Sequence, residues 1–454
     1  MKSAFETLWR DAGDCEFFVD GDISVTYADL AAAVDAAVLA LRDFGVAPSV
    51  PVLIKGDFSS HSIAVLLALI ANGNIVIPHT EASLDKLRPE VDLLCPAFLV
   101  DAGAAPFTIE RLAAAGPSCL MGLLPKGVPG LVVFSSGTTG RPKAIVHNVD
   151  LLLEKFSARP SKRVRAIPFL LFDHMGGFNT MLSILCGRGC IVYSRDRGID
   201  AICAAISRFK VDLLPTTPTF LTMLLVSGAW KVHDLSSLKV VTYGTEVMNE
   251  AVLARLVAVL PHVRFKQTYG LSEVGVLMTS SRGNDNTWVK LIGDGLETKV
   301  EDGILWIRVP SVMLGRVLFD GDSARFEPHG DAWFCTSDMV DVDGEYFRFK
   351  GRATDIISVS GLKVYPSEVE NCLLECTDVA NAVVFGKHNA LVGQVVVAQI
   401  ERSDPALPPA EARKRVLAHC RARLDRFKVP QEIQFIDHIG VSDRLKKKRT
   451  AEDA

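Results

Sequence analysis

The sequence has little net charge, few aromatic residues and no hydrophobic run long enough for a membrane span. Its 454 residues carry a formal net charge of −4, with 22% charged and 7% aromatic residues. This balance does not favour binding to nucleic acid or to an anionic membrane, and Lys446–Arg449 is the one basic cluster. The longest apolar stretch, Ile63–Ala71, is followed directly by Asn-Gly-Asn and is too short to cross a bilayer.

The cysteines are scattered along the chain and form no metal-binding pattern. The ten cysteines include two closer pairs, Cys186 with Cys190 and Cys372 with Cys376. Neither pair is joined by a second pair or by histidines at zinc-binding spacing. We interpret them as reduced thiols, which favours a cytoplasmic location. The N-terminus reaches Glu6 without an apolar segment, so the sequence predicts no signal peptide.

Hydrophobic residues make up 49% of the chain, and their spacing predicts an α/β fold. Short apolar runs such as 50–55 and 74–79 are typical of strands, and the stretch 59–73 between them predicts a helix. Thr26 and Asp29 have the spacing of a capping box at the start of another helix. This alternation of strands and helices favours a parallel sheet covered by helices.

The pattern changes after about residue 280, where glycine turns separate short strands. Asp343-Gly344 predicts a hairpin turn. A compact α+β module begins near Arg352, with a charged helix from about Pro409 to Asp425. We therefore expect a large N-terminal α/β domain with several subdomains at 1–350, a hinge at 351–355 and a small, mobile C-terminal α+β domain at 356–454.

A loop rich in hydroxyl groups and glycine lies between two strand-like segments, in the sequence FSSGTTGRPKAIVH at 134–147. Glycine lets the backbone approach a ligand, while N–H groups, hydroxyls and a lysine bind phosphate oxygens. The loop does not fit the Walker A pattern, and a plain turn is the alternative to a polyphosphate site. The candidate ligands are Ser135, Ser136, Gly137, Thr138, Thr139, Gly140 and Lys143.

Two further segments carry groups that suit a nucleotide. Gln267–Gly275 has the sequence QTYGLSEVG, in which Tyr269 is able to stack on a base and Glu273 to ligate Mg²⁺. Thr336–Asp338, with the sequence TSD, offers a carboxylate to ribose hydroxyls. A partly buried tyrosine, a solvated glutamate and a simple turn are the alternatives for these residues.

Together these segments resemble the adenylate-forming superfamily, which includes acyl- and aryl-CoA synthetases, peptide-synthetase adenylation domains and luciferases. SSGTTGRPK is similar to the family's phosphate loop. YGLSE resembles its Tyr-Gly-x-Thr-Glu element with Ser272 for threonine, and TSD resembles its Thr-Gly-Asp element with Ser337 for glycine. TYADL near the N-terminus and LDRFKVPQEI at 424–433 also match, so the resemblance covers nearly the whole chain.

The resemblance implies an enzyme that activates a carboxylic acid with ATP, releases pyrophosphate and transfers the acyl group to a thiol. It implies that the loop at 135–143 holds the β- and γ-phosphates and that Ser272 contacts the α-phosphate. Tyr269 would stack on adenine, and Glu273 would hold Mg²⁺. Asp338 and Arg352 would bind the ribose. The rest of the adenine pocket would be formed by Gly244, Thr245, Glu246 and Gly270.

The family's catalytic lysine near the C-terminus matches Lys446, with Lys447 and Lys448 as rivals and a solvated basic tail as the alternative. The Pro, Arg and Gly that precede this lysine in the family are absent here. The resemblance implies that the lysine stabilises charge during adenylation, and that the carboxylic acid needs no general base because it is ionised at pH 7.

The family alternates between two orientations of its C-terminal domain, one for each half-reaction. At the hinge, Thr354 replaces the usual aspartate or lysine, and Asp355 follows it. Gly361 matches the face that serves the second half-reaction, where the thiol enters. Ala144 replaces the glycine that usually follows the loop lysine.

The segment LLFDHMGGFNTML, from Leu170, resembles the wall of the acyl pocket in acyl-CoA synthetases. Gly176 and Gly177 would leave room for substrate, and His174 would gate the pocket or approach the carboxylate. A helix-entry histidine beside closely packed glycines is the alternative. Asp173 resembles the aspartate that binds the ammonium group in amino-acid-activating relatives. The sequence GLKVYPSEVE favours the CoA ligases, so we expect an acid without an α-amino group.

The acceptor is left open by the sequence. CoA is favoured, and the phosphopantetheine of a carrier protein is the alternative, because the stretch between His79 and Leu131 is short for the family. The departures at the hinge and around Lys446 also raise the alternative of a non-catalytic nucleotide-binding relative. We expect a small-molecule carboxylic acid as substrate, while its identity and the oligomeric state are not readable from the sequence.

Overall fold

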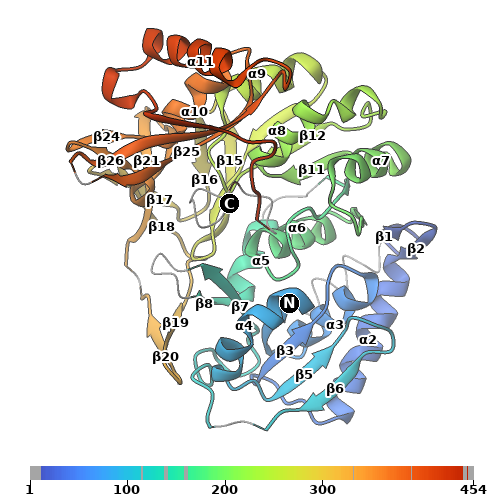
Figure 1. Cartoon of the computed structure of the whole chain (residues 1–454). Coiled ribbons are helices and arrows are strands. Elements are labelled where there is room, and N and C mark those ends of the chain that lie inside the picture. Colours follow the sequence, from blue (N-terminus) through green and yellow to red (C-terminus); the bar gives the residue numbers. More distant parts are fainter. Residues whose placement is uncertain are drawn as a thin grey trace.

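The computed structural model describes residues 12–113, 116–136, 142–157, 162–330, 332–389, 391–442 and 447. Among them, three sheets belong to the N-terminal domain and one to the C-terminal domain. Figure 1 shows the first domain from blue to light orange and the second in darker orange and red, with the second domain packed against one end of the first.

The first sheet has the strand order β20-β19-β8-β7-β4-β3-β5-β6. Its central strands β4, β3 and β5 are parallel, as predicted, and β7 runs parallel to β4. The strands from β7 to β8 and on to β20 are antiparallel. The strands are β3 (Pro51–Lys55), β4 (Ile75–His79), β5 (Phe98–Asp101), β6 (Thr108–Arg111), β7 (Gly130–Ser136), β8 (Pro142–Asn148), β19 (Gly315–Asp320) and β20 (Ser323–Pro328).

The second sheet has the order β13-β12-β11-β9-β10-β1-β2 and is parallel except for β2 at its edge. Parallel strands are fully covered and therefore apolar, which explains the short runs seen in the sequence. The strands are β1 (Glu16–Asp20), β2 (Ile23–Thr26), β9 (Arg165–Ala166), β10 (Cys190–Val192), β11 (Leu213–Thr216), β12 (Val240–Tyr243) and β13 (Arg264–Gln267).

The third sheet is antiparallel and accounts for the change in sequence pattern after residue 280. Its order is β14-β15-β16-β22-β21-β18-β17. The predicted hairpin is confirmed: Asp343 pairs with Tyr346, and Gly344 has a φ of 60°. The strands are β14 (Tyr269–Leu271), β15 (Gly275–Ser281), β16 (Val289–Ile292), β17 (Glu297–Glu301), β18 (Ile304–Arg308), β21 (Phe334–Asp343) and β22 (Tyr346–Arg352).

Most described helices of the N-terminal domain begin after a residue whose side chain caps them, whereas α7 follows Gly198 and has no side-chain cap. The predicted capping box is present, because the Thr26 side chain accepts from the Asp29 N–H and the Asp29 carboxylate accepts from the Thr26 N–H. The helices are α2 (Tyr27–Asp43), α3 (Ser60–Ala71), α4 (Glu81–Leu93), α5 (Val149–Ser157), α6 (Met175–Cys186), α7 (Ile199–Phe209), α8 (Pro218–Ser227) and α9 (Glu250–Val259).

The C-terminal domain is a five-stranded sheet with two helices. One hydrophobic cluster runs from residues of α8 and α9 into this domain, and α10 contacts α9. The predicted hinge residues end β22 and form a short 3₁₀ turn, Ala353–Asp355. The elements are β23 (Ile357–Val359), β24 (Leu362–Val364), α10 (Pro366–Leu374), β25 (Val379–Asn389), β26 (Gly393–Arg402), α11 (Pro409–Arg423) and β27 (Glu432–Phe435).

Candidate active site

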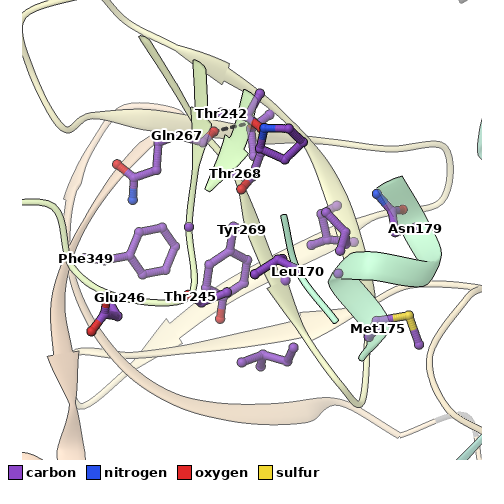
Figure 2. Close-up of a pocket in the computed structure, with 18 of the residues that line it drawn as sticks. Leu170, Met175, Asn179, Thr242, Thr245, Glu246, Gln267, Thr268, Tyr269 and Phe349 are labelled. Atoms are coloured by element: carbon purple, nitrogen blue, oxygen red, sulfur yellow. Dashed lines mark hydrogen bonds between the residues drawn. The ribbon is translucent and has the colours of Figure 1, made fainter. Parts of the chain in front are cut away.

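A cavity of about 610 Å³ lies where the second and third sheets, α5, α6 and the C-terminal domain meet. This volume is typical of a small-molecule site. Figure 2 shows Met175 and Asn179 on α6 at one side of the cavity, with Tyr269, Phe349 and Glu246 at the other. Many of the predicted site residues line it: Ser135, His174, Gly176, Gly244, Thr245, Glu246, Tyr269, Gly270, Ser272, Glu273, Asp338, Arg352 and Asp355.

Tyr269 and Asp338 are joined directly, although 69 residues separate them. The Tyr269 hydroxyl donates to Asp338 Oδ2 over 2.6 Å, and Arg352 Nε lies 3.7 Å from Asp338 Oδ1. Burial raises the pKa of Asp338, while the bond from Tyr269 and the charge of Arg352 act in the opposite direction. Burial, followed by the Asp338 charge, raises the pKa of Tyr269 well above its usual value. Tyr269 therefore stays protonated as a donor.

One face of the Tyr269 ring is covered by Phe349. The two rings are stacked, with centroids 4.4 Å apart and an interplanar angle of 14°. An adenine base is therefore able to stack only on the other face of Tyr269. Sequence analysis missed Phe349, although Phe347 and Phe349 are two positions apart in β22 and therefore lie on the same face of that strand.

Two residues of the cavity region have a left-handed backbone, which is strained for residues other than glycine. Thr245 has a φ of 71° and lines the cavity beside Gly244. Ser337 has a φ of 61° and precedes Asp338, at the position where the family has glycine. Ser337 therefore adopts the left-handed backbone that glycine adopts readily, and this conformation costs conformational free energy for serine.

The backbone carbonyl groups of Ser272 and Glu273 both accept hydrogen bonds that fix the main chain here. Both residues line the cavity wall. His147 Nε2 bonds the Ser272 carbonyl oxygen over 2.6 Å, and the Met313 N–H donates to the Glu273 carbonyl oxygen over 2.7 Å. His147 is completely buried, and burial lowers its pKa to about 4. The neutral ring therefore donates through Nε2, so His147 is a positioning residue that the sequence analysis did not predict.

The donor set around Glu273 fits Mg²⁺ bound together with a nucleotide. Mg²⁺ in such sites takes one or two carboxylates, and phosphate and water oxygens complete its coordination. Glu273 supplies a carboxylate on the cavity wall, close enough to Asp338 to raise the pKa of that group. No cluster of three or more metal-binding side chains occurs among the residues that the structure describes.

Glu246 connects the cavity to the C-terminal tail. Its Oε2 accepts from the Thr219 hydroxyl over 2.7 Å at the start of α8, and its Oε1 accepts from the Lys447 N–H over 2.9 Å. The Lys447 ammonium donates to the Ala382 carbonyl over 2.7 Å, within the C-terminal domain. Lys447 lines the cavity, whereas Lys446 and Lys448 lie outside the described residues.

The start of α6 forms another part of the wall. His174 is the N-cap residue, and its Nδ1 accepts from the Gly176 N–H over 3.0 Å. Gly176 lines the cavity, but Gly177 does not. A Cβ atom on Gly177 would lie 1.9 Å from the Leu171 carbonyl oxygen. Gly177 therefore serves close packing, which corrects its prediction as a pocket residue.

Asp173 is also absent from the cavity wall. It is buried, and its Oδ2 accepts from the Thr80 N–H over 3.5 Å on the side of the first sheet. Its charge acts on His79, whose pKa burial lowers to about 4. Asp173 therefore does not occupy the position expected of an ammonium-binding aspartate. Its position gives no support for an amino-acid substrate.

Some other predicted residues do not line the cavity, and some lie outside the described residues. Lys143 pairs with Ser135 across β7 and β8 but does not line it, and residues 137–141, with Gly137, Thr138, Thr139 and Gly140, lie outside the described residues. Thr354 is on the 3₁₀ turn, where its hydroxyl donates to the Asp355 carboxylate over 3.1 Å. Gly361 is exposed in the turn between β23 and β24, with a φ of 82°.

Comparisons with known proteins agree with this geometry. The model of the AMP-binding enzyme family matches residues 98–315, and that of the AMP-binding enzyme C-terminal domain matches residues 368–450. Together they span more than half of the chain. The chain belongs to the AMP-binding enzyme family. The predicted resemblance is therefore confirmed, and the cavity lies between the two matched domains of this family member.

Two curated relatives of this AMP-binding enzyme are CoA ligases. The indoleacetate–CoA ligase of Aromatoleum aromaticum is 28% identical over 346 residues, covering 68% of this chain but only 64% of that enzyme. A Mycobacterium tuberculosis CoA ligase acting on a methyl-dioxo-octahydroindenyl propanoate is 27% identical over 488 residues, covering 96% of this chain and 95% of that enzyme. The chain thus spans less than two thirds of the first relative and nearly all of the second.

The fold is shown by solved structures. A crystal structure of the anthranilate CoA ligase AuaEII in complex with anthranoyl-AMP superposes with a TM-score of 0.81 at 18% identity, covering 98% of this chain and 95% of that one. The predicted α/β fold with a large N-terminal and a small C-terminal domain is therefore confirmed.

Proposed function

We propose that this AMP-binding enzyme activates a carboxylic acid with ATP to an acyl-adenylate and transfers the acyl group to a thiol. The observation that carries the proposal is the meeting of the Tyr269–Asp338 pair with Ser272 and Glu273 in one cavity, closed by the tail at Lys447. An aromatic ring, a buried carboxylate, a hydroxyl and a metal-binding carboxylate are the groups that a Mg²⁺-nucleotide requires.

The first half-reaction joins two anions. A carboxylate oxygen of the acid attacks the α-phosphorus of ATP, the P–O bond to the β-phosphate breaks, and pyrophosphate leaves with the electron pair. No proton has to be removed, because the acid is ionised at pH 7. Catalysis therefore depends on positioning and on cationic groups near the developing charge. Mg²⁺ held by Glu273 would supply part of that charge, and we assign another part to Lys446.

Ser272 would donate its hydroxyl to an α-phosphate oxygen, and the bond from His147 to its backbone carbonyl supports this assignment. Asp338 and Arg352 would bind the ribose hydroxyls, and Gly244 and Thr245 would border the base; all four line the cavity. The hydroxyl-rich loop, including Lys143, would hold the outer phosphates. His174 and Gly176 border the space that the acyl group would fill, between α6 and β15.

In the second half-reaction the thiol sulfur attacks the acyl carbonyl carbon, and AMP leaves. The tail at Lys447 reaches the cavity while Gly361 lies away from it, an arrangement that suits the first half-reaction. Rotation about residues 351–355 would exchange the two faces. We assign the pivot to Thr354 and Asp355, and the domain boundaries stay as predicted.

We favour CoA as the thiol, because the names of both relatives describe CoA ligases. Loading of a carrier protein stays the alternative, as the segment between β4 and β7 is short. We also keep the cytoplasmic location as a prediction. Among the described helices, none combines the length and the hydrophobicity that a membrane crossing needs.

The test is pyrophosphate release with a panel of carboxylic acids, followed by addition of CoA or a holo-carrier protein. We expect acid-dependent formation of AMP and pyrophosphate, with a thioester formed on one acceptor. Lys446→Ala should abolish adenylation and largely spare thioester formation from preformed acyl-adenylate. Full adenylation by Lys446→Ala would refute the placement of the lysine, and absence of turnover with every acid would favour a non-catalytic nucleotide-binding protein.

A further inference from the structure

Lys155 is a cationic residue on the cavity wall that the nucleotide chemistry does not use. It lies on α5 and lines the cavity with Asn179 and Ser183 of α6 and Val276 of β15. Its ammonium group donates to the Val276 carbonyl oxygen over 2.8 Å and to Asn179 Oδ1. An ammonium group has three N–H donors, so these two bonds leave one donor for a ligand.

The surroundings of Lys155 contain no compensating negative charge. Among the described residues no carboxylate forms an ion pair with it. By contrast, Lys290, Lys299 and Lys350 in the third sheet each pair with an aspartate or a glutamate. Burial alone accounts for the lowering of its pKa to about 8. The Phe156 ring lies 4.9 Å from its ammonium nitrogen and His147 is neutral, so neither offsets a full charge. Lys155 is half-buried, and a half-buried cation without an anionic partner carries a desolvation cost that an anionic ligand would offset.

The position of Lys155 separates it from the nucleotide. The groups assigned to the base and ribose lie on β14, β21 and β22 and directly after β12, whereas Lys155 bonds to α6 and β15. This is the side where His174 and Gly176 border the space for the acyl group. Asn179 also lines the cavity, and Figure 2 shows it on α6 near Met175, across from Phe349 and Glu246. The lysine therefore lies on the side of the cavity that we assign to the acyl group.

A purely structural role for Lys155 would not explain why this position carries a charged group. Lys155 does connect α5 to α6 and β15, but a neutral side chain bonded to the Val276 carbonyl would make that connection without the cost of a charge. The hydroxyl of Ser183 on the same wall also adds a polar group where an unsubstituted hydrocarbon chain would need none. Lysine, amide and hydroxyl together form a binding set for an oxyanion.

We propose that Lys155 determines substrate specificity by binding a second anionic oxygen group on the acyl part, so that the preferred substrates are acids with an additional carboxylate. Asn179 and Ser183 complete the binding set. The inference rests on the proposed function, since it assigns the acid that the same cavity activates. An acid without the second group leaves the ammonium unpaired and is discriminated against for that reason.

The test compares matched acids that differ only in the second carboxylate, such as hexanoate with adipate and phenylpropanoate with its 4-carboxy derivative. The measured quantity is the ratio of kcat/KM values for AMP formation within each pair. For at least one pair we expect the wild type to favour the dicarboxylate at least tenfold. Lys155→Met should lower that ratio by about 10- to 100-fold, the range for a hydrogen bond between charged groups, while activity on the monocarboxylate is kept or rises. Lys126→Met, the same change at an exposed lysine, should leave the ratio unchanged.

The outcomes separate this inference from the proposed function. A wild type that prefers the monocarboxylate in every pair overturns the inference, and so does a ratio that Lys155→Met does not change. The wild-type ratio decides the question even where Lys155→Met does not fold. If no acid of either kind gives AMP and pyrophosphate, the proposed function itself fails, and the inference fails with it.

Discussion

The Tyr269 hydroxyl donates a hydrogen bond of 2.6 Å to the carboxylate of Asp338. The bond joins β14 to β21 within the third sheet, and it satisfies a carboxylate whose side chain is only 13% exposed. Because Arg352 is farther away at 3.7 Å, the phenol is the nearer partner of this buried charge. The groups that we assign to the base and to the ribose therefore form one unit.

Removal of the Tyr269 hydroxyl tests whether the Tyr269–Asp338 hydrogen bond supports nucleotide binding. Tyr269→Phe keeps the ring on Phe349 but leaves Asp338 without its nearer donor, so the carboxylate should lose its orientation and become easier to protonate. A hydrogen bond to a charged group contributes about 1.5–3 kcal/mol, and we expect the KM for ATP to rise about tenfold or more in steady-state assays. Tyr346→Phe, in the hairpin outside the cavity, is the matched control. An unchanged KM for ATP would contradict the account.

Glu246 offers a test of the closed arrangement of the tail. Glu246→Ala removes the acceptor of the Lys447 N–H and the contact with Thr219. Adenylation should slow about tenfold, because the tail is no longer held at the cavity, while thioester formation from added acyl-adenylate should change little. Glu250→Ala, on α9 and away from the cavity, should leave both half-reactions intact. Equal loss of both half-reactions would argue against a role in holding the tail.

His147 makes the stability of the fold depend on pH. Its pKa is about 4 in the folded protein against 6.5 for the free side chain, so the unfolded chain binds the proton first as the pH falls. Stability is therefore complete above pH 6.5 and is lost between pH 6.5 and 4, with a loss of about 2 kcal/mol at pH 5. Urea denaturation at pH 7 and pH 5 measures this loss. His147→Gln should show a smaller loss over the same interval, and an identical loss in both proteins would refute the assignment.

Thr245 provides a test of backbone strain. A β-branched residue with a φ of 71° costs about 1–3 kcal/mol, which glycine avoids at an entropic cost of about 0.5–1 kcal/mol. Thr245→Gly should therefore stabilise the protein by about 1 kcal/mol in thermal or chemical denaturation. Thr298→Gly, at an exposed position in the extended strand β17, should be destabilising. Destabilisation by both changes would show that the Thr245 conformation is not strained.

Much of the site was predictable because its residues lie in short contiguous motifs. Tyr269, Ser272 and Glu273 occur within five positions, and Asp338 sits in a recognisable triplet, so their residue types alone indicated nucleotide chemistry. The parallel strands were predictable because full burial makes them apolar. The hairpin at Gly344 followed from local turn preference.

The rest depends on contacts between distant segments. Phe349 and Lys155 lie in segments with no motif, and the fold alone brings them to the cavity. The sequence around His147 predicts an ordinary strand residue, and only the structure shows its hydrogen bond to the Ser272 carbonyl. Asp173 carries the right pattern for a substrate contact, but its side chain is buried toward His79. Sequence pattern gives a residue's neighbours along the chain, whereas the direction of a side chain depends on tertiary packing.

The most direct measurement of the central claim uses a carboxylic acid labelled with ¹⁸O in both carboxylate oxygens. If the acid attacks the α-phosphorus of ATP in this cavity, the thiol later displaces AMP by breaking the bond between the acyl carbon and the bridging oxygen. Mass spectrometry should then find one ¹⁸O atom in each AMP and none in pyrophosphate. AMP without label, or label in orthophosphate released together with ADP, would contradict the account.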